Sequence, residues 1–273
     1  MLTYALLGAT GATGSAALRY LLAEPLQGLN VHILVRSENK LLRAFPELEK
    51  ITEPSIRIFE GSSTDTAALE PCLRDANVVF MCVGQNESRK GSVLCYDSAA
   101  STVETLKTLR KLQGSAYNIP TVVLLRSASL NPVLAQQVPK FVHRAVSFCL
   151  HYNYADIKRA CEVWQAAAGD GILYYVFVDP PTIHDAHGRE RTGYKLISSE
   201  KQTIALSYAD LGAALCEIGM RAAEFRNDAV GVTATGRVRK TWGVLASFLA
   251  SGAKNRVVDL VEVSQPQGYT YGM

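Results

Sequence analysis

Two side chains near the middle of the sequence, Tyr154 and Lys158, have the types and spacing to move a proton. They lie four residues apart at the start of a predicted helix over 152–168, so they share one face of it. A free phenol has a pKa of about 10, and lowering it to neutrality requires about 4 kcal/mol. One ammonium about 4 Å away supplies roughly that much at an effective dielectric constant of about 20. The pair is a candidate acid–base catalyst, although Tyr-x-x-x-Lys alone is more often a solvated helix face.

Two hydroxyl side chains, Ser127 and Ser129, follow the predicted strand over 121–125. In a parallel sheet, ligands bind at the carboxyl ends of the central strands. Either serine could therefore hold a substrate oxygen, and the sequence leaves the choice between them open. The alternative is plain turn chemistry, which Ser, Asn and Pro also supply.

Three glycines near the N-terminus, Gly8, Gly11 and Gly14, follow an apolar run and precede a predicted helix over 12–23. In a dinucleotide-binding turn the first glycine allows the tight turn and the second lets the backbone approach a pyrophosphate. The third lets helix and strand pack closely. The helix N-terminus then offers free N–H groups to the phosphates. The alternative is an ordinary glycine-rich turn between a strand and a helix.

Arg36 stands where the predicted strand over 31–35 ends. An acidic residue at that point accepts a hydrogen bond from the adenosine ribose in NAD-binding folds. Here a guanidinium takes its place and Lys40 is nearby, which favours a 2′-phosphate and so NADP(H) over NAD. The alternative is a solvated surface arginine.

Further candidates follow the third and fourth predicted strands. Ser62 lies in a loop that could pass beside the adenine, while Asp65 has the pattern of a helix N-cap. Gly84 would let the backbone lie close to the nicotinamide ribose. Gln85 and Asn86 are candidates for substrate or ribose contacts.

Alternation of short apolar strands with helical patterns predicts an α/β protein with a parallel, doubly wound sheet. The near-continuous apolar strands suit burial on both faces. The first strand is expected at the N-terminus, directly before Gly8, and the next five at 31–35, 55–59, 78–83, 121–125 and 173–178. Helices are expected at 12–23, 38–44, 65–73, 92–113 and 152–168.

Composition narrows the class of protein further. The net charge of +3, without clustered basic residues, argues against a nucleic-acid partner. Six cysteines without paired spacing are interpreted as buried free thiols in a reducing compartment, and no signal peptide or membrane span is visible, so the protein is expected in the cytoplasm. His184 and His187 lack a third ligand at a recognisable spacing, so no metal is expected, and a substrate contact is the preferred interpretation of either histidine.

The apolar segment 133–150 carries Phe141, Ala145, Phe148 and Cys149 on one helical face. It is a candidate to line a hydrophobic substrate pocket, with ordinary packing as the default and contact with a membrane surface as an alternative. Further helices are predicted from Asp210, which caps or anchors the first of them, to about Glu224, and near 241–248. The tail 264–273 is expected on the surface.

Taken together, these motifs resemble an extended or atypical short-chain dehydrogenase/reductase of the NmrA-like, NAD(P)-binding group. More loosely, the sequence resembles fungal averufin-oxidase-like proteins of aromatic polyketide pathways. The resemblance covers most of residues 1–240. The segments that carry it are Gly8, Gly11, Gly14, Arg36, Val83-Gly84, Ser127, Tyr154, Lys158 and Asp179-Pro180-Pro181.

The resemblance implies a Rossmann fold, NADP(H) and a Ser–Tyr–Lys catalytic set. Tyr154 would then exchange the proton, Lys158 would lower the phenol pKa and bind the nicotinamide ribose, and Ser127 would hold the substrate oxygen. It also assigns further residues to the cofactor: Thr10, Ala12 and Thr13 at the pyrophosphate turn, Ser62, Val83 and Gly84 after later strands, and Pro181 and Ile183 beside the nicotinamide.

We therefore expect a single Rossmann-type domain over 1–273, with a cofactor core in 1–180 and a small substrate-binding portion in 181–273. The leading hypothesis is an NADP(H)-dependent oxidoreductase acting on a carbonyl or alcohol of an apolar small molecule in secondary metabolism. The alternatives are a non-catalytic dinucleotide sensor and a non-redox isomerase or cyclase on the same fold. The resemblance also suggests a homodimer through the helix at 92–113.

Overall fold

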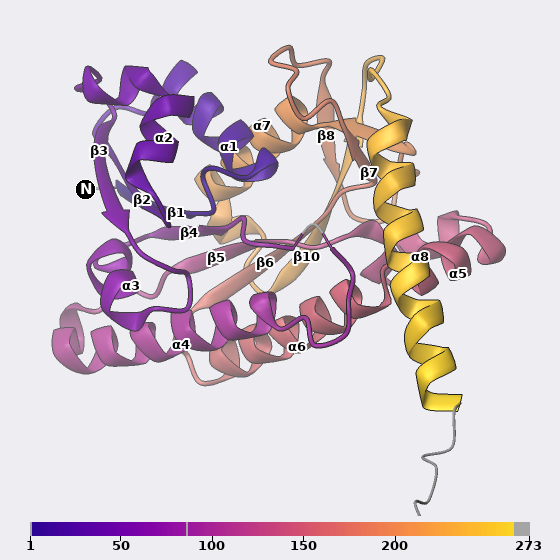
Figure 1. Ribbon diagram of the computed structural model, residues 1–273. Helices are drawn as coiled ribbons and strands as arrows, with labels where there is room; N and C mark the ends of the chain where they lie inside the picture. The colour runs from indigo at the N-terminus through magenta and orange to yellow at the C-terminus, as the bar shows by residue number, and fades with distance from the viewer. Residues whose placement is uncertain (1, 86, 265–273) are drawn as a thin grey trace, which may run out of the picture.

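A computed structural model describes residues 2–85 and 87–264. Within these residues, eight strands form one sheet in the order β3-β2-β1-β4-β5-β6-β10-β8, all parallel except β8 (Figure 1). Two short strands, β7 and β9, pair separately. The strands are β1 Leu2–Leu7, β2 Leu29–Val35, β3 Ser55–Glu60, β4 Val78–Met81, β5 Thr121–Leu125, β6 Tyr174–Asp179, β7 Thr182–His184, β8 Tyr194–Ile197, β9 Ala205–Ser207 and β10 Asp228–Ala234.

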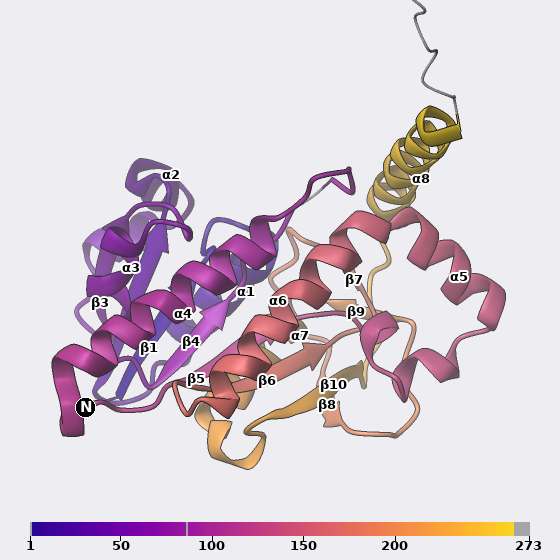
Figure 2. The same ribbon diagram turned by 90° about the horizontal axis from the view of Figure 1, so that it is seen from below.

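Helices cover both faces of this sheet. Figure 1 shows α1 and α7 above it, and Figure 2 shows α4 and α6 lying side by side across the other face with α3 next to them. The predicted doubly wound α/β architecture is confirmed. The helices are α1 Ala12–Ala23, α2 Glu38–Ala44, α3 Thr66–Leu73, α4 Leu94–Gln113, α5 Lys140–Cys149, α6 His151–Gly169, α7 Tyr208–Met220 and α8 Trp242–Ser264.

Alternate side chains of the central strands point to opposite faces of the sheet and pack in two separate hydrophobic cores. In β1, Tyr4 and Leu6 pack on the α1/α7 side, whereas Ala5 and Leu7 pack on the α3/α4/α6 side. Because both faces are covered, the strand is apolar at nearly every position, as the sequence pattern indicated.

The C-terminal third completes the core instead of forming a separate layer. Gly212 of α7 lies so close to α1 that a Cβ there would overlap the backbone of Ala16 and Ala17. Asp210 is buried and accepts hydrogen bonds from the backbone N–H groups of Thr192 and Gly193, each at 3.0 Å. This carboxylate anchors a loop, whereas the side chain of Ser207 caps α7.

Several element boundaries differ from the predicted ones. Strand β4 ends at Met81. The N–H of Cys82 donates the last bond to the carbonyl of Leu7, because the neighbouring strand β1 ends there and its chain turns at Gly8. Helix α7 ends at Met220 and is followed by a separate 3₁₀ turn. The last predicted helix, 241–248, is too short, because α8 continues to Ser264; residues 265–273 lie outside the described part of the chain.

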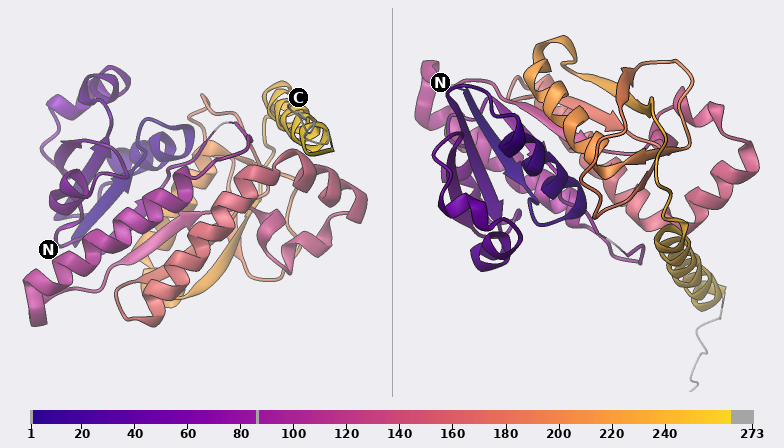
Figure 3. Two further views of the ribbon diagram at one scale, coloured as in Figure 1. Left: turned by 60° about the horizontal axis from the view of Figure 1, so that its bottom comes forward. Right: turned by 90° about the horizontal axis from the view of Figure 1, so that it is seen from above.

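The apolar segment 133–150 is α-helical only in α5, from Lys140 onward, and a 3₁₀ turn over Leu134–Gln137 precedes Pro139. Helices α5 and α8 pack on each other at one end of the molecule, at the opposite end from α2 and β3 (Figure 3). Phe141 of α5 is 76% exposed, so the predicted apolar face is largely open in this structure. In the described residues no helix combines the length and apolarity that a bilayer crossing requires.

All six cysteines have free thiols. Cys72, Cys161 and Cys216 are buried as predicted, whereas Cys82, Cys95 and Cys149 are only partly covered. Burial raises the pKa of the Cys72 thiol to about 12, so this thiol stays protonated at neutral pH.

Candidate active site

The turn between β1 and α1 requires glycine at two positions, because a side chain at either one would overlap the backbone of the protein itself. Gly8 has φ +90°, and a Cβ there would lie 2.5 Å from the carbonyl oxygen of Cys82. A Cβ at Gly14 would overlap the carbonyl group of Gly8. Gly8 thus allows the turn beneath β4, and Gly14 lets α1 approach the strand closely.

Gly11 has a different position, because it is exposed at the N-cap of α1 and provides no side chain to cap the helix. Its own N–H donates to Gly8, but the N–H groups of Ala12 and Thr13 have no acceptor within the described residues. Free amides at a helix N-terminus bind phosphate groups. The turn therefore fits the pyrophosphate of a dinucleotide, with the neighbouring Thr10 half-buried beside it.

Arg36 follows β2 and is exposed, and its guanidinium has no hydrogen-bond or ion-pair partner in residues 2–85 and 87–264. Ser37 caps α2 by accepting from the backbone N–H of Lys40 at 3.3 Å. Ser62 lies in the loop after β3, where its hydroxyl bonds that of Thr64 at 2.9 Å. Asp65 caps α3 through Ala67, which confirms the predicted N-cap.

The segment after β4 has an open backbone. A Cβ at Gly84 would meet no atom within 4 Å, so packing within the described chain does not require glycine at this position. The carbonyl of Val83 accepts a weak bond from Cys95 Sγ at 3.9 Å, and that of Gln85 accepts from Asn153 at 3.1 Å. Asn86 lies outside the described residues.

Ser127 and Tyr154 meet at the carboxyl end of β5. Ser127 Oγ lies 3.2 Å from Tyr154 Oη, and the tyrosine is only 8% exposed. Ser129 makes no side-chain hydrogen bond among the described residues; its N–H lies 3.3 Å from Ser127 Oγ and its carbonyl 3.0 Å from His143 Nε2. The structure therefore brings Ser127, not Ser129, to the tyrosine.

Lys158 lies one helical turn after Tyr154 on α6, and its side chain is exposed. Within the described ranges its ammonium has no ion-pair partner. It is close enough to His151 to contribute, after burial and Arg256, to lowering the pKa of that imidazole. The ammonium is thus available to a ligand on the side of α6 that carries Tyr154.

A buried carboxylate that sequence reasoning missed fixes the position of α6. Helix α4 begins after Val93, which has no capping side chain. Instead, Asp156 of α6 accepts from the N–H groups of Cys95 at 2.8 Å and Tyr96 at 3.0 Å. The signal was an aspartate inside the Tyr154–Lys158 spacing, on a helix face otherwise expected to be buried.

A second group missed from the sequence lies beneath Ser127. Arg126 binds Asp179 through two bonds, Nε to Oδ1 at 2.7 Å and Nη2 to Oδ2 at 2.5 Å, and Asn131 adds a third at 2.8 Å. The fully buried Asp179 ends β6. Burial raises the pKa of its carboxyl, and the Arg126 guanidinium opposes that change. The network ties the ends of β5 and β6 together next to the hydroxyl pair.

Pro181 lies between the end of β6 and the start of β7, and Ile183 lies within β7. Next to them His184 is fully engaged. Its Nδ1 accepts from the N–H of Thr241 at 3.1 Å, and its Nε2 lies 3.0 Å from the hydroxyl of Thr182. His184 is therefore a structural residue instead of a free substrate contact, and His187 is exposed. The described residues contain no cluster of His, Cys, Asp or Glu suited to a metal ion.

A family model described as NAD(P)H-binding matches residues 8–219, from the first glycine of the turn through α7. The chain belongs to this NAD(P)H-binding family. Among curated relatives of this NAD(P)H-binding protein, averufin oxidase A of Dothistroma septosporum is 58% identical over 97% of this chain and 95% of its own length. Averufin oxidase stcO of Emericella nidulans is 54% identical, with 92% and 89% covered.

More distant relatives agree with this assignment. Oxidoreductase ordB of Dothistroma septosporum is 32% identical over 86% of this chain and 84% of its own length. A short-chain dehydrogenase/reductase of Veillonella parvula, solved in complex with NADP, is 21% identical and shares the fold with a TM-score of 0.61, with 86% and 95% of the two chains covered. This NAD(P)H-binding protein is an NAD(P)-dependent oxidoreductase, and it shares its fold with the short-chain dehydrogenase/reductase of Veillonella parvula.

Proposed function

We propose that the protein is an NADP(H)-dependent reductase or dehydrogenase for a carbonyl or alcohol of an apolar small molecule. Given the names of its relatives, the substrate is averufin or a related compound of secondary metabolism. The observation that carries this proposal is the Ser127–Tyr154 hydroxyl pair, with Lys158 on the next turn of the same helix. A non-catalytic dinucleotide sensor has no need of such a pair.

The chain's residues have distinct roles in this proposal. Ala12 and Thr13 hold the pyrophosphate with their N–H groups, and Gly11 gives it close backbone access. Gly84 lets the backbone lie close to the nicotinamide ribose, and the nicotinamide, when bound, would supply or accept the hydride. In the reducing direction Ser127 Oγ donates a hydrogen bond to the carbonyl oxygen, and Tyr154 Oη transfers its proton to that oxygen. Lys158 stabilises the tyrosinate left behind and contacts the nicotinamide ribose.

Arg36 supports NADP(H) over NAD(H) because its unpaired guanidinium follows β2. NADPH should therefore bind more tightly than NADH to wild type, and Arg36→Gln should remove most of this preference. Equal affinities of wild type for both cofactors would contradict this part of the proposal.

Tyr154→Phe tests the mechanism. Removing the proton donor should lower kcat by about 100-fold or more while leaving the Kd for NADPH within about twofold. NADPH oxidation with averufin and a carbonyl panel gives kcat, and direct titration gives Kd. Tyr96→Phe is the matched control, because the Tyr96 ring packs under Arg159 at 4.1 Å and no hydrogen bond of its hydroxyl is found in the described chain. Comparable rates for wild type and Tyr154→Phe would remove Tyr154 from the mechanism.

Two further expectations are part of this proposal. The free thiols favour a reducing compartment, in agreement with a cytoplasmic location. A homodimer through α4 stays a prediction, to be tested by the mass of the native particle in solution.

A further inference from the structure

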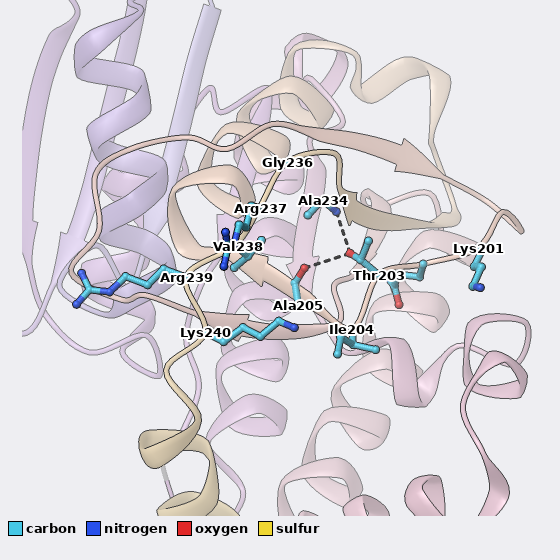
Figure 4. Close-up of a pocket in the computed structure, with 11 residues that line it drawn as sticks. Lys201, Thr203, Ile204, Ala205, Ala234, Gly236, Arg237, Val238, Arg239 and Lys240 are labelled. Carbon is cyan, nitrogen blue, oxygen red and sulfur yellow. Dashed lines mark hydrogen bonds between the residues drawn. The ribbon is translucent and has the colours of Figure 1, made fainter.

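A large cleft lies beside β9, between residues 201–205 and the segment 234–240 that follows β10 (Figure 4). Its volume is about 920 Å³. Neither Ser127 nor Tyr154 lines it, and neither do the glycines of the β1–α1 turn. The cleft is therefore distinct from the hydroxyl pair and from the dinucleotide turn.

The walls of this cleft are cationic. Lys201, Arg237, Arg239 and Lys240 belong to the lining, which includes no Asp or Glu. Across residues 2–85 and 87–264 none of these four side chains forms an ion pair. The adjacent Glu200 forms no ion pair with them in the described residues, and its Oε2 accepts from the N–H groups of Ser198 and Ser199 at 2.8 and 3.1 Å.

The orientations of these cations differ. Figure 4 shows Lys240 extending toward Ala205 and Ile204 on the opposite wall, whereas Arg239 points away from both. Ile204 is 64% exposed and, with Val238, gives the cleft an apolar surface. In addition, the backbone N–H groups of residues 236–240 donate to no acceptor in the described chain. An apolar surface beside an unpaired cation and free amides suits an apolar molecule that carries an anionic group.

The cleft adjoins the expected nicotinamide position. The hydroxyl of Thr182 donates to the carbonyl of Ile204, and Ile183 pairs in register with Leu206 of β9. The wall formed by residues 201–205 therefore leads directly into β9, the strand paired with the β7 segment that contains Ile183. One elongated ligand could contact both regions.

We propose that this cleft binds a carboxylate or an ionised phenol of an apolar substrate, with Lys240 as its principal contact. The substrate class is thus an acidic carbonyl or alcohol compound. The role in catalysis rests on the function proposed above, but the binding itself does not depend on turnover.

Binding is tested by calorimetric titration without cofactor. The probes are 2-naphthoate against methyl 2-naphthoate, and 4-nitrophenolate against 4-nitroanisole, so that the two anion types are measured separately. Lys240→Gln should weaken binding of at least one anion about tenfold and leave its neutral partner unchanged. Arg239→Gln is the control, because it removes the same charge from a side chain that points away. Anions that bind no better than their neutral partners, or equal losses in both variants, would overturn the proposal.

A second pair of variants avoids the contact between Lys240 and the Trp242 ring, which are 6.0 Å apart. Ile204→Asp places a carboxylate on the wall opposite Lys240 and should also reduce anion binding about tenfold. Val244→Asp adds the same charge to a residue that is 76% exposed on α8, outside the cleft lining. An effect of Val244→Asp equal to that of Ile204→Asp would contradict a local site.

Turnover then separates this proposal from the previous one. If acidic substrates are reduced, Lys240→Gln should raise their KM about tenfold at nearly constant kcat, without affecting neutral ones. If no substrate is turned over, the proposed function fails while the titrations still decide whether the cleft binds anions.

Discussion

Ser127 and Tyr154 are 27 residues apart in the chain, yet their hydroxyl oxygens lie 3.2 Å apart. Two buried carboxylates account for this proximity. Asp179 binds Arg126, the residue before Ser127, and Asp156 fixes the first turns of α6, where Tyr154 lies. Each hydroxyl is thus held by a neighbour in sequence that is itself tied to another element.

Gly14→Ala tests the close approach of α1 to the turn. The added Cβ would overlap the Gly8 carbonyl, so helix and turn must separate. We expect about 1–3 kcal/mol lower stability by denaturant titration and about tenfold weaker NADPH binding by direct titration. Gly243→Ala is the control, because a Cβ there meets no atom within 4 Å. Unchanged NADPH affinity in Gly14→Ala would contradict this account of the turn.

The sequence predicted some site residues and missed others for a physical reason. The glycine turn and the Tyr154–Lys158 spacing are local patterns, readable within a few residues. The bond acceptors Asp156 and Asp179 find their donors 61 and 53 residues away, in Cys95 and Arg126. No local pattern encodes such a partner, and the choice between Ser127 and Ser129 likewise required the folded geometry.

Among the elements, Asp156 links α6 to α4: its carboxylate, on α6, accepts from the first N–H groups of α4 and so caps that helix. Asp156→Ala leaves the N–H groups of Cys95 and Tyr96 without their acceptor and lets α6 shift. We expect a loss of about 1–2 kcal/mol in stability and a 10- to 100-fold lower kcat, as a rough range, because the Tyr154 hydroxyl is displaced.

Steady-state kinetics distinguish this positioning role from general damage. The KM for NADPH should stay nearly constant, and Asp156→Asn, which keeps one acceptor oxygen, should recover part of kcat. An equal loss for Ala and Asn, or a rise in the NADPH KM of the same size as the fall in kcat, would argue against positioning.

Helix α8 begins at a contact that depends on pH. His184 Nδ1 accepts from Thr241, directly before α8, and burial, followed by the charge of Lys240, lowers the pKa of His184 below its usual 6.5. The unfolded chain therefore takes up this proton at a higher pH than the folded one. The stabilisation is complete above pH of about 6.5 and is lost as the pH falls through the lower folded-state pKa.

Hydrogen exchange measured at pH 7.5 and pH 5 should accordingly show weaker protection at the start of α8 under acid conditions, after correction for intrinsic rates. His184→Gln removes the titrating group and should make this difference disappear. A pH difference that persists in His184→Gln would assign the effect to a group other than His184.

The element boundaries, like the site residues, were predicted where local patterns define them and missed where contacts with distant residues do. The bounds of α1, α2 and β5 agree with the prediction to the residue, because the glycine turn, the Ser37 cap and an apolar run define them locally. The length of α8 was missed. This helix is held by contacts with residues far away in the chain, such as the bond from Asn255 to the Ser88 carbonyl at 2.9 Å.

At the scale of the whole molecule, β10 and β8 share a sheet with β1–β6, and α7 packs on α1. We therefore propose that the two sequence portions, 1–180 and 181–273, fold as one unit. Thermal unfolding should show one cooperative transition. NADPH at about 100 times its Kd should raise the midpoint by about 5–10 °C, because binding adds about 2.7 kcal/mol.

Circular dichroism and the tryptophan fluorescence, which comes from Trp164 in the first portion and Trp242 in the C-terminal portion, report on this transition through different signals. Coincident curves that shift together with NADPH are expected. Two separate transitions, or a shift confined to one probe, would contradict a single unit.

The seating of Gly212 against the backbone of Ala16 also bears on how the protein is made. The glycine turn leaves the ribosome about 200 residues before α7. Because α7 covers the apolar side of α1, that side stays exposed while the residues between them are synthesised. Nascent chains that stop before α7 should therefore bind chaperones and be degraded. We therefore expect residues 1–180 to reach their folded state only after α7 has emerged from the ribosome.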